Sequence, residues 1–169
     1  RAIPWPSLAE RFQVTGAVVA SSAVHRGVGL CAGLDASDAA ELGDEHFKAM
    51  TATVLDEFAK KDFVYVHASL SDEVVHGSDV NATVQAIEAF DRDLVGPILE
   101  GLAKKGPYRF LALCDHGEGV QGQAFAVFGE GPGKDGVSGD RRFTETDAQA
   151  SKAPVRDASK FVTKLFAKG

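Results

Sequence analysis

Short apolar runs alternate with helical patterns in the first part of the chain. The run 14–20 is rich in β-branched residues and predicts a strand, and two serines after it could cap a helix that runs to Gly33. A second helix is predicted after Asp44, because apolar residues then recur along one helical face as far as Phe58. Residues 63–66 form a continuous apolar run, which is typical of a strand buried on both faces of a parallel sheet.

The same alternation continues in the second part. A long helical pattern begins at Val80, and Pro97 is expected to kink it. Residues 108–114 and 124–128 predict two further strands. A final amphipathic helix is predicted after Asp157, which is a suitable capping residue.

This order of elements and the chain length together predict the fold class. Strands that alternate with helices favour an α/β fold, with a largely parallel sheet sandwiched by helices. At 169 residues, of which 44% are hydrophobic and 25% charged, the chain suits one core, so a single domain is expected over residues 1–169.

Charge and cysteine usage narrow the class of partner and the compartment. A net charge of -6 argues against nucleic acid or an anionic membrane and favours a small metabolite. Cys31 and Cys114 lie in apolar sequence without metal or redox spacing, so we interpret them as reduced core residues. Since no apolar stretch approaches the roughly 18 residues of a membrane span and no signal-peptide pattern opens the sequence, a cytoplasmic location is predicted.

Candidate metal ligands follow two of the predicted strands. Asp72 and His76 come after the strand at 63–66, and Asp115 and His116 come directly after the strand at 108–114. Ligands bind at the carboxyl ends of strands in open α/β sheets, so both pairs are expected to point into one place. Carboxylates and neutral imidazoles are ligands that Zn²⁺ and Mn²⁺ accept. Surface loops or capped turns are the alternative interpretation of these residues.

The order of residues around these pairs resembles a known enzyme family. Residues 63–91 resemble the signature "DFVYVH...DE..H.GD...AIE..D" of cofactor-independent, archaeal-type phosphoglycerate mutases of the alkaline phosphatase superfamily. Residues 8–33 resemble the family's "LPSFxERYGxxGAVISAVDLIKGIGxxAG", and residues 124–131 its "PFLIYGPG". The chain is therefore similar to the C-terminal part of such an enzyme, and an alkaline phosphatase-like core without its N-terminal portion is expected.

The resemblance implies two divalent ions, which are Mn, Zn or Mg. Asp72 and His76 match the family positions that hold one ion, and Asp115 and His116 match those that hold the second. In the family the ions activate a serine, which takes the phosphoryl group from phosphoglycerate as a phosphoserine and returns it, interconverting 2- and 3-phosphoglycerate. That serine belongs to an N-terminal segment absent from this sequence, so the chain holds no catalytic nucleophile and is expected to be inactive alone.

Some matching positions depart from the family. A third histidine ligand has no counterpart in residues 117–125, where Glu118 offers an oxygen donor or is simply a solvated carboxylate. Arg26 stands at a family lysine, so we interpret it as a substrate-binding candidate, with a solvated surface cation as the alternative. Thr83 replaces another lysine that contacts phosphate in the family.

The remaining histidines carry weaker signals. His67 ends a predicted strand, where it either orients Asp72 or is a core imidazole bonded to backbone, and we favour the core interpretation. His46 is interpreted as a surface residue, and His25 has no partner that the sequence identifies.

Three functional hypotheses remain. The first is an enzyme fragment that binds phosphoglycerate. The second is a non-catalytic binding or regulatory homologue, and the third is another phosphoryl-transfer enzyme such as a phosphatase or phosphonate hydrolase. Exposed sheet edges would favour pairing, so a homodimer or an upstream N-terminal segment is the expected protein partner.

Overall fold

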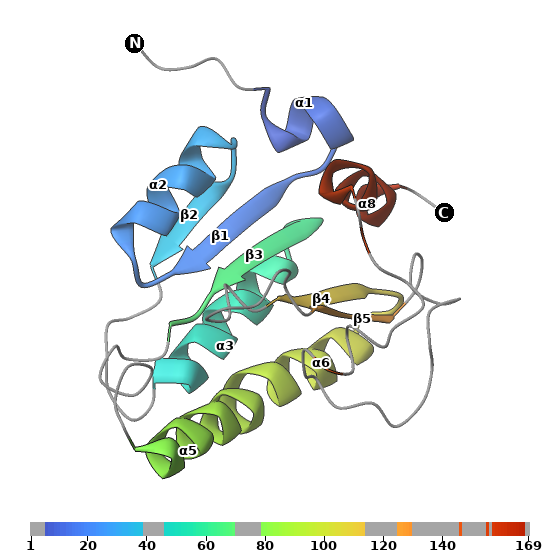
Figure 1. Cartoon of the computed structure of the whole chain (residues 1–169). Coiled ribbons are helices and arrows are strands. Elements are labelled where there is room, and N and C mark those ends of the chain that lie inside the picture. Colours follow the sequence, from blue (N-terminus) through green and yellow to red (C-terminus); the bar gives the residue numbers. More distant parts are fainter. Residues whose placement is uncertain are drawn as a thin grey trace. The chain divides into compact units, whose positions relative to one another are not determined.

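The structure is a computed structural model that describes residues 6–38, 46–69, 79–113, 125–129, 146, 155 and 157–167 (Figure 1). The chain divides into two compact units, Arg1–Lys104 and Lys105–Gly169, which are described separately. No helix within the described ranges is long and apolar enough to cross a membrane. A single domain over the whole chain stays a prediction.

A three-stranded parallel sheet forms the centre of the first unit. Its strands are β1 (Gly16–Ala20), β2 (Asp35–Asp38) and β3 (Phe63–His67), in the order β2-β1-β3. Because β1 lies between the other two strands, it is the most buried, and its residues Ala17 to Ala20 are 0% exposed. The predicted α/β class with a largely parallel sheet is confirmed.

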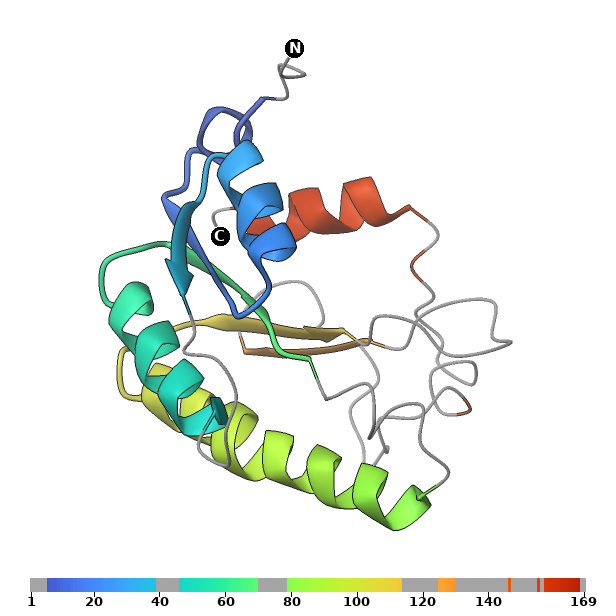
Figure 2. The same ribbon diagram turned by 90° about the vertical axis from the view of Figure 1, so that its left-hand side faces the viewer.

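Helices cover both faces of this sheet. The helices are α1 (Leu8–Phe12), α2 (Ala23–Cys31) and α3 (His46–Phe58). Helix α2 packs so closely on β1 that a Cβ atom added to Gly29 would lie 2.3 Å from the Cγ1 atom of Val18. Neighbouring side chains of a strand point to opposite faces, so Val19 faces away from α2. Helix α3 also contacts β1 and β3, and it lies on that opposite face (Figure 2).

A long helical segment completes the first unit. It consists of α5 (Val80–Phe90), the π-helical turn η1 (Asp91–Val95) and α6 (Gly96–Ala103). The N–H of Gly96 donates to the carbonyl of Asp91, five residues earlier, which is the π-helical pattern. Pro97 follows at once and has no N–H to donate, so the predicted irregularity occurs at Pro97 as a π-helical turn.

The second unit contains a β-hairpin ladder and a terminal helix. Strands β4 (Arg109–Leu113) and β5 (Phe125–Gly129) pair antiparallel, and helix α8 spans Ala158–Phe166. The carboxylate of Asp157 accepts the backbone N–H of Lys160 at 3.0 Å, which confirms the predicted cap. The guanidinium of Arg109 donates to the carbonyls of Leu165 at 2.5 Å and Ala167 at 2.7 Å, so it holds the last turn of α8 against the start of β4.

Several burial predictions are wrong. Strand β3 is not buried on both faces, because Tyr65 is 43% exposed and the strand lies at the end of the described sheet. Val84 and Ile87, which share the helical pattern with the buried Leu94, are 47% and 53% exposed. Cys31 is an exposed free thiol at the end of α2 and not a core residue.

Candidate functional site

The carboxyl ends of β1 and β3 lie side by side in the first unit. In the parallel register Ala20, the last residue of β1, stands beside His67, the last residue of β3. Helix α2 begins three residues after Ala20 and brings His25 and Arg26 back to this end of the sheet. Ligand sites of open α/β sheets lie at this kind of strand end.

Arg26 is hydrogen-bonded to the backbone at the end of β1. Its Nη1 atom donates to the carbonyl oxygens of Ala20 at 2.8 Å and Ser21 at 2.6 Å, and both contacts are partly buried. The side chain therefore anchors the first turn of α2 instead of extending freely into solvent. Its predicted role in substrate binding stays a prediction.

His25 and His67 form a stacked pair at the same end of the sheet. Their ring centroids are 3.4 Å apart and the ring planes differ by 18°. The Nδ1 atom of His67 lies 3.5 Å from the hydroxyl of Ser69, whereas the Nδ1 atom of His25 is buried without a hydrogen-bond partner. The sequence gave no signal for this pair, because a contact between a helix and a strand 42 residues apart follows no local pattern.

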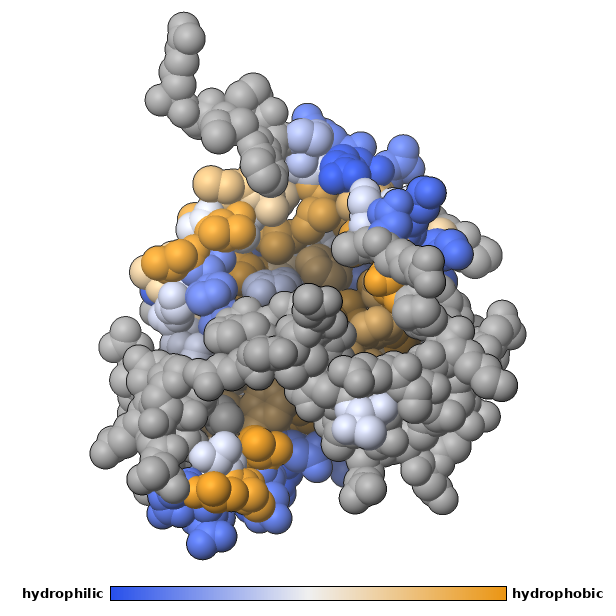
Figure 3. All heavy atoms as spheres, viewed as in Figure 1, coloured by the Kyte–Doolittle hydropathy of each residue, from blue (hydrophilic) through white to orange (hydrophobic). Residues whose placement is uncertain are grey.

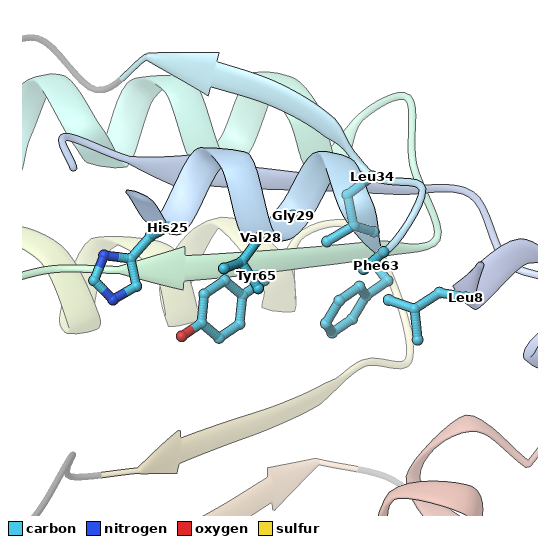
Figure 4. A pocket seen from close by; sticks show the side chains of 8 residues that line it. Leu8, His25, Val28, Gly29, Leu34, Phe63 and Tyr65 are labelled. Carbon is cyan, nitrogen blue, oxygen red and sulfur yellow. The ribbon is translucent and has the colours of Figure 1, made fainter. Parts of the chain in front are cut away.

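An apolar hollow lies beside this pair. It has a volume of about 230 Å³ and is lined by Leu8, His25, Val28, Gly29, Ala32, Leu34, Phe63 and Tyr65 (Figure 4). The neighbouring surface of α2 is also apolar, since Val24, Val28 and Leu30 are 72%, 64% and 60% exposed (Figure 3). This face of the first unit offers apolar contact and few polar groups.

The predicted metal ligands lie outside the described residues. These are Asp72, His76, Asp115, His116 and Glu118. Within the described ranges, no group of three or more His, Cys, Asp or Glu side chains could hold a metal ion.

The elements that flank the predicted ligands are described. β3 ends before the first pair and belongs to the parallel sheet, whereas β4 ends before the second pair and pairs antiparallel with β5. The two pairs therefore do not follow strands hydrogen-bonded into one parallel sheet, although their convergence stays a prediction. Asp79, another residue of the signature, caps α5, because its carboxylate accepts the backbone N–H groups of Asn81 at 2.9 Å and Ala82 at 3.2 Å.

Comparison with known proteins identifies related sequences. A model of the Metalloenzyme superfamily matches residues 39–124. A probable 2,3-bisphosphoglycerate-independent phosphoglycerate mutase of Geobacter sulfurreducens is 38% identical over 113 residues, which are 65% of this chain and 28% of that protein. The 2,3-bisphosphoglycerate-independent phosphoglycerate mutase of Methanothrix thermoacetophila is 34% identical over 115 residues, 66% of this chain and 29% of that protein.

A solved structure shares the fold. The PH0037 protein of Pyrococcus horikoshii superposes with a TM-score of 0.70 at 21% identity, over 89% of this chain and 47% of that one. The chain spans under a third of the length of the two mutases named above. The predicted resemblance to part of these enzymes is confirmed.

Proposed function

We propose, from the premise that this chain belongs to the Metalloenzyme superfamily, that it is the metal-binding part of a phosphoglycerate mutase. The observation that carries this proposal is the position of the four predicted ligands. Asp72, His76, Asp115 and His116 all fall within residues 39–124, the segment that matches the superfamily. Relatives named as mutases share up to 38% identity with the chain.

The four ligands form two carboxylate–imidazole pairs. In this proposal Asp72 and His76 hold one divalent ion, and Asp115 and His116 hold a second. Carboxylate oxygen with imidazole nitrogen is a donor set that suits Mn²⁺ and Zn²⁺, while Mg²⁺ favours oxygen donors. Divalent ions in such a site would withdraw charge from a phosphoryl group. Glu118 is a further oxygen donor, and we rank it below the two pairs.

Arg26 is the proposed contact for the substrate phosphate. A guanidinium carries five N–H donors, and a phosphate group accepts them in pairs. The Nη1 atom already donates to two carbonyls, which fixes the side chain at the carboxyl end of the sheet. A residue held in this way would meet an anion with little further loss of side-chain entropy.

The isolated chain is proposed to bind metal and phosphoglycerate without mutase turnover, since it has no match to the family's serine segment. The exposed apolar surface of α2 supports a protein partner, either a second copy or a segment like the additional length of the relatives. If a phosphatase is the correct alternative, the chain with metal will release inorganic phosphate from phosphoglycerate. A non-catalytic homologue will release none.

Metal binding tests the proposal. We expect calorimetry to measure micromolar Mn²⁺ or Zn²⁺ binding by the native chain and none, or far weaker binding, by an Asp115→Ala/His116→Ala variant. His46→Gln is the matched control, because His46 lies on α3 and is not a proposed ligand. Absence of binding by the folded native chain, or unchanged binding by the double variant, would refute the proposed metal role.

A further inference from the structure

Two imidazole rings meet where α2 returns to the sheet. His25 lies in the first turn of α2, and His67 is the last residue of β3. The rings are stacked at a centroid distance of 3.4 Å and an angle of 18°. Both residues belong to the first unit, so the contact joins two of its elements directly.

We propose that the His25–His67 stack is a proton-sensitive contact that fastens the first turn of α2 to the end of β3 and opens in acid. Neutral imidazoles stack as ordinary aromatic rings. Two protonated imidazoles at this distance would repel each other, because their positive charges would lie face to face. The stack is therefore stable only while at least one ring is neutral.

The surroundings of the pair also oppose protonation. The guanidinium of Arg26 is fixed at the carbonyl of Ala20, and Ala20 is the register neighbour of His67. A proton on either ring thus adds a positive charge near an existing one. Among the described side chains, the nearby acidic groups are already engaged, since Asp35 pairs with Lys61 and Glu57 accepts from Ser37 at 2.8 Å.

The other charged or titratable groups on the packed elements are distributed as follows. Tyr65 stands two residues before His67 on β3, and Asp38 stands beside Ala20 in the register of β2. On α1, Glu10 accepts from the backbone of Ser7 at 2.7 Å, and the guanidinium of Arg11 lies 5.2 Å from the ring centroid of Phe12. None of these contacts pairs a carboxylate with either histidine.

The buried nitrogen of His25 identifies the form that the fold favours. Its Nδ1 atom has no hydrogen-bond partner and almost no contact with solvent. As a lone pair this atom leaves an acceptor unused, but a proton there would create a buried donor without an acceptor, which is more costly. Folding therefore favours the neutral ring, and acid favours the state in which the ring is released.

Release of the stack has a structural consequence. Arg26 follows His25 directly, so the turn that opens also carries the guanidinium bound to the end of β1. We expect the first turn of α2 to loosen while the centre of the sheet stays intact, because β1 is fully buried. The inference rests on this geometry and not on the proposed metal chemistry.

Amide hydrogen exchange of the full chain tests the proposal. Between pH 7.5 and 5.0 the protection of the α2 amides, corrected for the intrinsic exchange rate, should fall about tenfold or more in the native chain. His25→Phe retains a stacked ring that cannot be protonated, so its α2 protection should change little over this range. His46→Gln on α3 should behave like the native chain.

Two results would overturn the proposal. One is native α2 protection that does not depend on pH beyond the intrinsic rate. The other is a His25→Phe variant that loses protection in acid as the native chain does. If His25→Phe does not fold, His67→Phe provides the same test from the strand side, with the same expected and opposing results.

Discussion

The hydroxyl of Thr51 on α3 donates to the backbone carbonyl of Asp93 in η1 across 2.8 Å. Pro97 lacks the N–H that would bond this carbonyl in a regular α-helix. Thr51 is only 8% exposed, and its hydroxyl also lies 2.9 Å from the carbonyl of Phe47, so one proton serves two acceptors. A side chain of one helix thus satisfies a backbone group that proline leaves open in another.

Removal of this hydroxyl should destabilise the chain. Thr51→Val keeps the shape and leaves the Asp93 carbonyl without its donor, so we expect the free energy of unfolding to fall by about 1–3 kcal/mol. Thr51→Ser retains the hydroxyl and should lose less. Urea unfolding of the three proteins measures the difference, and equal stability of native and Val variants would contradict the assigned role.

Two glycines of α2 should respond oppositely to alanine. A Cβ atom at Gly29 would lie 2.3 Å from Val18, so Gly29→Ala should destabilise the chain by about 1–3 kcal/mol through overpacking. A Cβ atom at Gly27 would meet nothing within 4 Å, so Gly27→Ala should stabilise α2 by up to about 1 kcal/mol. Thermal unfolding compares the two variants, and a loss of stability at Gly27 equal to that at Gly29 would argue against the described packing of α2.

The capping box of α1 predicts a dependence on acid. The backbone N–H of Ser7 donates to the Glu10 carboxylate at 2.7 Å, and the Ser7 hydroxyl adds a second hydrogen bond, so the pKa of Glu10 lies below its usual 4.5. Because folding lowers this pKa, the carboxylate stabilises α1 above about pH 4.5, and the effect is lost as the pH falls through the folded value.

Titration of the Glu10 side-chain carbon by NMR measures that pKa directly. We expect a midpoint below 4.5 in the native chain and a return toward 4.5 in Ser7→Ala, which removes the hydroxyl. A native midpoint at or above 4.5 would show that the capping box does not form in solution.

Local patterns predicted most elements of the fold but not all of them. The apolar runs that became β1 and β3 are strong strand signals, since both are rich in β-branched residues. Strand β2 has the sequence Asp-Ala-Ser-Asp, which carries no strand signal, and it forms because β1 offers it a parallel partner. Helix α1 was not predicted, although Ser7 and Glu10 at capping-box spacing were a usable signal.

The candidate site shows a different limit. Asp72, His76, Asp115 and His116 come from the order of residues in a family signature, and no periodicity of apolar positions would select them. The His25–His67 stack depends on where two distant elements meet, and it became visible only in the folded arrangement. Arg26 was selected as a cation for substrate, whereas its carbonyl contacts reveal an anchoring role in addition.

The most direct measurement of the central claim is anomalous X-ray diffraction from crystals of this chain grown with Mn²⁺. The account predicts anomalous peaks at bonding distance, about 2.0–2.2 Å, from the carboxylate and imidazole atoms of the Asp72/His76 and Asp115/His116 pairs. Peaks bound only by other side chains, or no peak in well-ordered crystals, would contradict the assignment of these four residues as metal ligands.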